Sequence, residues 1–414
     1  MKTIRNFEVF GLFLLILTDH SFASSNHINP ETKERILARV SHLIQNKAFA
    51  FDTDFDRWPE ILQTHRNAID SASTVNEFEE ALDLSLDAFE ISHLYITPPK
   101  IKASDSSRPI RRLGINGPNT KTGISVTHVT KESPAAEAGI RKLDTVTSIN
   151  GAWPARLNYL KGIRGERLTI EWTRQGESMS GKITCRPFTS TDLPWIEWPS
   201  PNVAVIHIQG FTNEGYKMLT ISKLFRQAND AQAIIIDLRN NYGGYLHNAL
   251  HLAGKVLERN QIFALHVSRK HYSNFEHEVN LEKHITSSEA IRHSRKLKPT
   301  FSLKRYKGKL AVLVDGYSAS AADIFPAAIQ EHQRGLVIGT QSSGALIGSR
   351  VTRLPDGYRL TYPFVEVLTS QGNRLESNGV VPDIELSWQE TANDSIIYER
   401  TIQTLLPKNA LLRK

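Results

Sequence analysis

The sequence contains a single cysteine, Cys185, so no disulfide can form within the chain. Beyond the amino terminus, no apolar run is long enough to cross a bilayer as a helix. The sequence also lacks a glycine-rich phosphate loop, a Cys/His spacing typical of zinc sites and an HExxH motif. We therefore expect no cofactor, no metal and no disulfide scaffold, but two or three domains with ordinary hydrophobic cores, for which 414 residues suffice.

The amino terminus has the pattern of a secretory signal peptide. Lys2 and Arg5 precede an apolar run from Val9 to Leu17, and small residues around Ala23 offer a cleavage site. As a helix this run would cover roughly 14 Å, about half of the hydrocarbon thickness of a bilayer. We expect residues 1–23 to be removed near Ala23 and the protein to be periplasmic or secreted, without an integral membrane segment. A retained amino-terminal helix is the alternative.

Positive charge is concentrated in one stretch of the chain. Residues 267–309 carry eleven Lys or Arg against four Glu, which equals the formal net charge of +7 for the whole chain. Such a run is more typical of a solvated insertion than of a nucleic-acid surface. We predict a basic insertion that leaves the core over residues 267–309, and no nucleic-acid partner.

A small helical domain is predicted for residues 28–105. Asn29 and Pro30 have the form of a helix start, and Thr74 and Glu77 have the spacing of a capping box. The helix that begins there should end near Ser92 and His93, because the chain that follows is β-prone and then contains paired prolines.

Residues 110–188 change to short β-type segments separated by glycines, with one short helix framed by Ser133 and Gly139. This region resembles a PDZ domain of the type found in bacterial proteases. The resemblance implies that a peptide adds as an extra strand and that its carboxylate is held near Leu113, Gly114 and Ile115. A PDZ domain that serves only as a packing module is the alternative.

A layered α/β core is predicted for residues 195–388, followed by a helical tail over 389–414. Strand and helix patterns alternate, and the strands are apolar enough to be buried on both faces. The predicted elements are strands 203–208, 233–238, 310–315 and 335–339, and helices 217–227 and 320–333.

Two strand-to-helix junctions in this core carry candidate catalytic groups. The first, residues 237–244, ends in Gly243 and Gly244, whose backbone N–H groups are unobstructed by side chains. The second, residues 315–324, places Ser320 at the start of a helix. Taken singly, a glycine pair is usually a turn and such a serine is usually a helix cap.

Together the two junctions resemble the core of the carboxyl-terminal processing, or tail-specific, peptidases. The matching motifs are Leu-Arg-Asn-Asn-x-Gly-Gly at 238–244, Gly-Tyr-Ser-Ala-Ser-Ala-Ala-Asp-Ile at 316–324 and Asn-Gly-Val-Val-Pro-Asp-Ile at 378–384. The resemblance implies a crotonase/ClpP-like layered protease core with Ser320 as nucleophile. It also implies an oxyanion hole made by Gly243 or Gly244 together with the N–H of Ala321.

The sequence departs from this family at the general base. Family members with a Ser-Lys pair have lysine where this chain has Ala345, which cannot accept a proton. The sequence instead resembles the tricorn-type branch of the family, which also lacks this lysine. That branch has a Ser-His pair before the PDZ domain and a later glutamate, and the matching residues here are Ser92, His93 and Glu376. This resemblance implies that His93 is the general base, oriented by Glu376 or Ser92.

Other histidines compete for the role of base. His207, His247 and His251 remain candidates, and the spacing of the last two could indicate a metal pair, although no third ligand is signalled. Histidine at position 93 could equally be a residue that only caps a helix.

The resulting hypothesis is an exported serine endopeptidase that cleaves unstructured or carboxyl-terminal protein segments through an acyl-enzyme on Ser320. Its partners would be proteins or peptides with free or disordered carboxyl termini. The alternative from another class is a noncatalytic, PDZ-containing peptide-binding scaffold, which Ala345 keeps open. A third reading is a zymogen-like state blocked by the PDZ domain or the basic insertion. The physiological substrate and the oligomeric state stay open.

Overall fold

The computed structural model describes residues 27–99, 109–110, 113–152, 162–163, 167–186, 188, 193–268, 292 and 294–407. The predicted signal peptide, most of the predicted basic insertion and the end of the predicted tail lie outside these residues. Within the described ranges, no helix has the length and apolarity needed to traverse a membrane.

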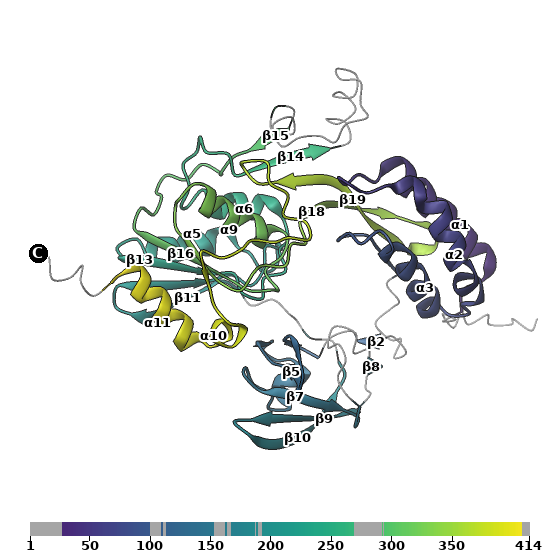
Figure 1. Ribbon diagram of the computed structural model, residues 1–414, viewed down its shortest axis with the longest axis horizontal. Coiled ribbons are helices and arrows are strands. Elements are labelled where there is room, and N and C mark those ends of the chain that lie inside the picture. The colour runs from purple at the N-terminus through teal and green to yellow at the C-terminus, as the bar shows by residue number, and fades with distance from the viewer. Residues whose placement is uncertain are drawn as a thin grey trace, which may run out of the picture.

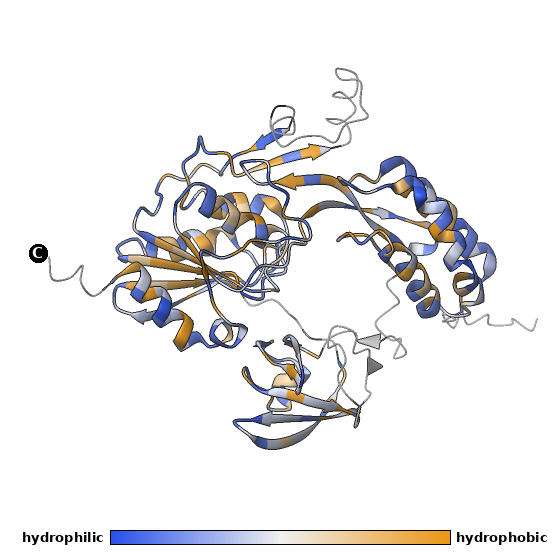
Figure 2. Cartoon of the chain, in the orientation of Figure 1, coloured by the Kyte–Doolittle hydropathy of each residue, from blue (hydrophilic) through white to orange (hydrophobic). Residues whose placement is uncertain are grey.

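The core is a six-stranded sheet covered by helices on both faces (Figure 1). In spatial order its strands are β11 (Trp195–Ser200), β12 (Val203–His207), β13 (Ala233–Asp237), β16 (Lys309–Val314), β17 (Leu336–Gly339) and β20 (Ile384–Glu385). All neighbours are parallel except the edge strand β11. Figure 2 shows the apolar character of these strands, which is typical of a parallel sheet buried on two sides. The predicted α/β fold is confirmed.

The side chains of this sheet alternate between two helical layers. One face packs on α5 (Met218–Gln227), α6 (Leu246–Ala253) and α9 (Ala321–Glu331). The other face packs on α11 (Asp394–Leu405), which follows α10 (Trp388–Ala392). This arrangement directs the loops after β13 and β16 to the same edge of the sheet, because the carboxyl ends of parallel strands meet there.

A second sheet joins the amino-terminal helices to the core. It contains β1 (Tyr95–Thr97), β19 (Arg359–Leu368), β14 (Ala264–Ser268) and β15 (Arg295–Leu297), with β18 (Ile347–Arg353) also paired to β19. Helices α1 (Pro30–Lys47), α2 (Trp58–Ser71) and α3 (Val75–Asp87), with the short helix η1 (Phe55–Arg57), share a hydrophobic core with β18 and β19. The long strand β19 thus runs from the core to the helices (Figure 1), and η3 (Pro355–Gly357) joins β18 to β19.

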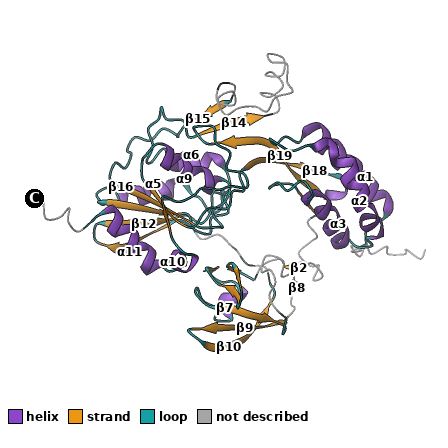
Figure 3. Ribbon diagram, in the orientation of Figure 1, coloured by secondary structure: helices purple, strands orange, loops and turns teal. Residues whose placement is uncertain are grey.

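The described residues between Pro109 and Phe188 form a separate β-rich unit with its own hydrophobic core, in which strands outnumber helices (Figure 3). Its sheet has the order β10 (Glu177–Thr184), β9 (Arg167–Arg174), β7 (Thr145–Ile149), β5 (Gly123–Ser125) and β4 (Asn119–Thr120). Two further antiparallel pairs are β2 (Pro109–Ile110) with β8 (Gly162–Ile163), and β3 (Ile115–Asn116) with β6 (His128–Val129). The short helix α4 (Pro134–Glu137) begins after Ser133, whose hydroxyl accepts from the N–H of Ala136.

Polar bonds between described residues join the β-rich unit to the core. The N–H of Gly117 donates to the hydroxyl of Tyr317 at 2.9 Å, and Nδ2 of Asn116 donates to Oδ1 of Asn240 at 3.2 Å. Lys142 makes an ion pair of 2.7 Å with Asp394 at the start of α11. Two of these contacts reach the loops that follow β13 and β16.

Two predicted boundaries are corrected by the structure. The predicted capping box of Thr74 and Glu77 is present, but α3 ends at Asp87 and not near His93. The reason is Glu90, whose φ of 55° is left-handed and cannot continue a helix. The predicted insertion ends before Arg295 and not at residue 309, because β15 pairs with β14 and Tyr306 is buried with its hydroxyl donating to Ala231 O.

Candidate active site

Ser320 stands at the junction of β16 and α9 in a strained backbone conformation. Its φ of 57° and ψ of −113° lie outside the regions that L-residues ordinarily adopt. The N–H of Ser320 is held by Oδ2 of Asp323 at 2.6 Å, in the first turn of α9. Such strain persists only where neighbouring groups enforce it, and a sharp strand-to-helix turn is the setting in which a serine hydroxyl is presented to a ligand.

The glycine-pair loop is packed directly against Ser320. A Cβ added to Gly243 would lie 2.7 Å from Cβ of Ser320 and 3.0 Å from the backbone N of Ala321. Any other residue at position 243 would therefore collide with the serine. The structure brings together the two sequence motifs that carried the family resemblance.

Hydrogen bonds tie the two loops to each other. Oδ1 of Asp315 accepts from the backbone N–H groups of Asn240 and Tyr317, each at 3.0 Å. The hydroxyl of Ser318 donates to Leu238 O at 2.8 Å, and the N–H of Ala319 donates to Asn241 O at 2.9 Å. Burial raises the pKa of Asp315, against the hydrogen bonds that it receives. The relative position of the glycine pair and Ser320 is thus fixed by several bonds.

The three predicted oxyanion donors differ in their present partners. The N–H of Gly243 donates to Oδ1 of Asn241 at 2.8 Å, so this donor is occupied. The N–H groups of Gly244 and Ala321 form no hydrogen bond with any described residue. Two of the three donors can therefore receive an oxyanion without breaking an existing bond.

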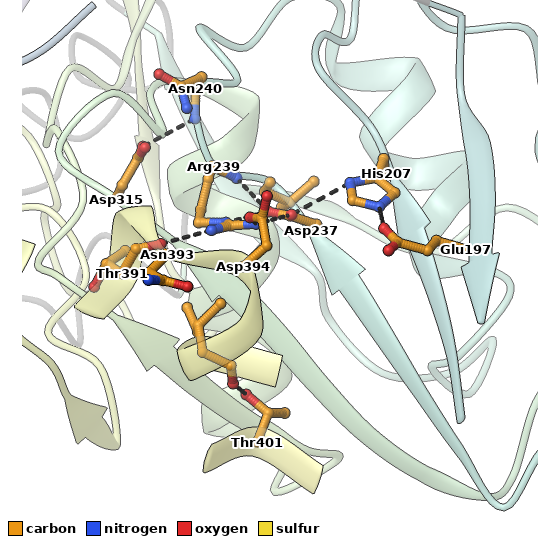
Figure 4. A network of polar contacts seen from close by, with 12 residues as sticks. Glu197, His207, Asp237, Arg239, Asn240, Asp315, Thr391, Asn393, Asp394 and Thr401 are labelled. Carbon is orange, nitrogen blue, oxygen red and sulfur yellow. Dashed lines mark hydrogen bonds and ion pairs between the residues drawn. The ribbon is translucent and has the colours of Figure 1, made fainter. Parts of the chain in front are cut away.

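An ion-pair network lies at the base of the glycine-pair loop (Figure 4). Arg239 donates through Nε and Nη2 to both oxygens of Asp237, through Nη1 to Thr391 O at 2.6 Å, and through Nη2 to Asp394 at 2.8 Å. Burial opposes ionisation of Asp237, but the adjacent guanidinium outweighs it and holds the pKa of that carboxyl well below its usual range. Because Asp394 also binds Lys142, the network connects this loop to the β-rich unit.

Ser92 and His93 lie in the loop between α3 and β1, where Glu376 binds Ser92. The N–H of Ser92 donates to Oε1 of Glu376 at 2.8 Å, and its hydroxyl donates to Oε2 at 3.1 Å. Oγ of Ser92 is also 2.6 Å from Nδ1 of His93, whose φ of 60° is left-handed. The structure therefore brings together three of the four predicted catalytic residues.

The contacts of Ser92 define a tautomer for His93. A carboxylate only accepts hydrogen bonds, so the Ser92 hydroxyl gives its proton to Glu376 and accepts from Nδ1–H of His93. Nε2 is then the basic nitrogen. Burial lowers the pKa of His93, and the charge of Glu376 opposes this effect, so the ring is neutral at pH 7.

The fourth residue, Ser320, connects to this group through the loop that contains Ala345. Asp323 Oδ1 accepts from Ser342 Oγ at 2.5 Å and from the N–H of Gly344 at 3.0 Å. Glu376 Oε2 accepts from the N–H of Leu346 at 2.6 Å. No hydrogen bond between described residues joins the Ser320 hydroxyl to His93.

Asp323 is the functional candidate that sequence reasoning missed. It is fully buried, and burial raises its pKa to about 6, although the hydrogen bonds from Ser342, Gly344 and Ser320 oppose the shift. Its position three residues after Ser320 in a helix was the available signal, since a residue there can accept from the N–H of the helix cap.

The competing histidines are engaged elsewhere. His207 lies between Glu197 and Asp237 and stacks on Trp195. Nδ1 of His251 is 2.9 Å from the hydroxyl of Tyr216, and burial together with Lys255 lowers the pKa of this histidine to about 4. His247 Nε2 is 3.2 Å from Asn213 Oδ1. In the part of the chain that is described, no group of three or more His, Cys, Asp or Glu could hold a metal ion.

The predicted peptide-binding residues lie within the β-rich unit. Leu113, Gly114 and Ile115 are all buried, and the carbonyls of the first two accept from the N–H groups of Ala135 and Thr130. These bonds hold the segment against α4 and β6.

Comparison with known proteins relates the core to a peptidase family. Residues 202–386, a little less than half of the chain, match the family model of Peptidase family S41. The chain is 27% identical over 301 residues to a probable CtpA-like serine protease of Staphylococcus aureus strain N315, and 24% identical over 310 residues to its counterpart in Staphylococcus haemolyticus. The alignments cover 70% and 73% of this chain but 56% and 58% of those proteins, so the chain spans little more than half of their length. The resemblance to carboxyl-terminal processing peptidases is confirmed.

Several solved structures share the fold of this chain. Mature CPAF superposes with a TM-score of 0.61 at 15% identity, covering 91% of this chain and 96% of that one. The photosystem II D1 C-terminal processing protease gives 0.55 at 15% identity, covering 88% and 98%. The tricorn protease gives 0.53 at 18% identity, covering 91% of this chain and 36% of that one. At these identities the likeness establishes the fold alone.

Replacement of Glu376 by Gln tests its contacts with Ser92 and Leu346. Both carboxylate oxygens of Glu376 accept hydrogen bonds, whereas glutamine has one oxygen and one NH2 group. The NH2 group must therefore face at least one of the three donors. We expect kcat/KM for an unstructured fluorogenic peptide to fall by about 10- to 100-fold, since a lost hydrogen bond to a charged group costs about 1.5–3 kcal/mol. The exposed Glu177→Gln is the matched control, and equal activity of both variants would contradict this role.

The two shifted pKa values predict the acid limb of the pH profile. His93 must be neutral to act as a base, and ionised Asp323 must accept from the N–H of Ser320. We expect kcat/KM to fall below a pH of about 6, at or under the ordinary histidine pKa of about 6.5. The limb should have a two-proton slope in the wild type and a one-proton slope in Asp323→Asn. A midpoint above pH 7, or an unchanged slope in the variant, would argue against these assignments.

Proposed function

We propose that this chain is an exported serine endopeptidase that hydrolyses unstructured or carboxyl-terminal segments of proteins. The observation that carries the proposal is the strained Ser320 at the start of α9, packed on Gly243 beside unoccupied N–H donors. The match of residues 202–386 to the model of Peptidase family S41 supports the same reaction class. Export rests on the signal-peptide pattern of residues 1–23.

In the proposed reaction, Oγ of Ser320 attacks the scissile carbonyl and its proton passes to Nε2 of His93. The carbonyl oxygen becomes an oxyanion that receives the N–H groups of Ala321 and Gly244, and one such donor is typically worth about 10² to 10³ in rate. The imidazolium then protonates the leaving amine, and water hydrolyses the acyl-serine by the reverse proton path. His93 must approach the serine hydroxyl within about 3.2 Å for the first transfer, a contact that often tightens only when substrate binds.

The hydrogen-bonded chain from Glu376 through Ser92 to His93 supports the choice of base. A carboxylate, a hydroxyl and an imidazole in this order perform the orienting role of a triad, with Ser92 inserted between the acid and the histidine. The desolvated His93 stays unprotonated at neutral pH, as a base requires. Glu376 is thus a positioning residue and His93 the catalytic one.

We further propose that the β-rich unit is a PDZ domain that receives substrate carboxyl termini near Leu113, Gly114 and Ile115. Its antiparallel sheet and the helix capped by Ser133 support this assignment. The small helical domain supplies Ser92 and His93 to the core. Substrates would be protein chains with free or disordered ends, because only such chains could reach both the PDZ domain and Ser320.

A noncatalytic scaffold is the second candidate, favoured by Ala345 in place of the lysine of other family members. In that reading the PDZ domain captures chain ends and Ser320 is inert. The two candidates differ in one measurable property, the nucleophilicity of the Ser320 hydroxyl.

Labelling with a fluorophosphonate tests this property directly. We expect the purified mature protein to be labelled at neutral pH and Ser320→Ala to be unlabelled, because an activated serine attacks phosphorus as it attacks a carbonyl. Ser178→Ala, which removes an exposed serine of β10 in the β-rich unit, is the matched control and should be labelled like the wild type. Equal labelling of wild type and Ser320→Ala would favour the scaffold.

Peptidase assays on a casein-like disordered substrate separate His93 from its rivals. We expect His93→Ala to lose at least 10²-fold in kcat/KM, the usual contribution of general base catalysis being about 10² to 10⁴. His251→Ala should retain activity within a few-fold, since its ring contacts Tyr216 and Ser222. Unchanged turnover in His93→Ala would remove it from the mechanism.

A further inference from the structure

Two large aromatic side chains flank the glycine pair beside Ser320 and are unusually exposed. Tyr242 precedes Gly243 and is 43% exposed, while Tyr245 follows Gly244 and is 53% exposed. Tyrosine side chains ordinarily bury most of their ring. The nearby Tyr216, by comparison, is 2% exposed and belongs to the hydrophobic core.

The positions of the two rings are set by neighbours on opposite sides of the glycine pair. The Tyr242 ring lies edge-on to Tyr317, with centroids 6.0 Å apart, and Tyr317 belongs to the loop that ends in Ser320. The Tyr245 ring stacks on His247 at 5.4 Å. His247 in turn contacts Asn213 in the loop after β12. One ring therefore leans toward the nucleophile loop and the other toward the loop before α5.

Both residues are within two positions of the backbone that touches the nucleophile. A Cβ at Gly243 would be 2.7 Å from Cβ of Ser320, and consecutive Cα atoms are about 3.8 Å apart. A carbonyl under attack by Ser320 must lie against the N–H groups of this same loop. The substrate residues on either side of that carbonyl are then within side-chain reach of the two rings.

We propose that Tyr242 and Tyr245 form an aromatic subsite that selects bulky apolar side chains next to the scissile bond. This inference rests on the proposed function. Apolar side chains would cover ring faces that now contact water, gaining about 25 cal/mol for each Å² buried, while the phenolic hydroxyls stay hydrated at the rim. Since folded proteins bury their large apolar residues, such a subsite favours unfolded segments over native surface loops.

The first arm of the test measures cleavage. Two disordered fluorogenic peptides differ only in having Leu or Ser on both sides of the scissile bond, and kcat/KM is compared for wild type, Tyr242→Ser, Tyr245→Ser and the double variant. We expect wild type to prefer the Leu peptide by about 10- to 100-fold, in line with the discrimination of apolar pockets. In the double variant this ratio should fall to within about 3-fold. Trp198→Ser, an aromatic residue of equal 43% exposure on edge strand β11, is the matched control and should keep the wild-type ratio.

The second arm measures binding in the Ser320→Ala background by fluorescence anisotropy of the same peptides, so it reads the subsite even if no cleavage occurs. Stronger binding of the Leu peptide that is lost in the double variant would support the subsite, whatever becomes of the proposed peptidase activity. An unchanged preference in the double variant, with its melting temperature at the wild-type value, would overturn the inference while leaving the role of Ser320 intact. Equal binding of the Leu and Ser peptides to the parent Ser320→Ala protein would overturn it as well.

Discussion

The site depends on one buried carboxylate, that of Glu376. It is 3% exposed and receives hydrogen bonds from two segments that are more than 200 residues apart in sequence, the backbone and hydroxyl of Ser92 and the N–H of Leu346. Burying a charge is unfavourable unless donors replace its water, so the carboxylate enforces the convergence of these donors. The orientation of His93 follows from this requirement, because Ser92 Oγ is bonded to both groups.

The two sheets supply the rigidity that this convergence needs. The register of β1 on β19 places Tyr95 opposite Thr361. His93 comes two residues before Tyr95, so this pairing fixes its position beside the core. The parallel strands β13 and β16 deliver the glycine pair and Ser320 to one edge, where Asp315 joins their loops. The site therefore stands where a parallel sheet and an antiparallel sheet meet, with each sheet supplying part of it.

A structural feature could be predicted from the sequence where the residues that determine it are neighbours along the chain. The capping box of α3, the apolar strands and the turn at Ser320 are encoded by residues within a few positions of one another, and these predictions agree with the structure. The end of α3 could not be predicted, because glutamate is not a residue type that signals the left-handed backbone found at Glu90. Asp323 was missed for a different reason. Its partners Ser342 and Gly344 are some twenty residues away, and sequence alone does not show which donors will meet a buried acid.

Because position 345 holds alanine and not lysine, other contacts must fix the conformation of its loop. The N–H groups on either side of this residue, at Gly344 and Leu346, are held by Asp323 and Glu376 respectively. One carboxylate also binds the backbone of Ser320 and the other binds Ser92, so the same loop connects Ser320 to the segment that contains His93. A long side chain at position 345 is therefore unnecessary for the shape of the loop. In the proposed reaction the base comes from a separate segment, so the integrity of the site is linked to the docking of the amino-terminal helices on β18 and β19.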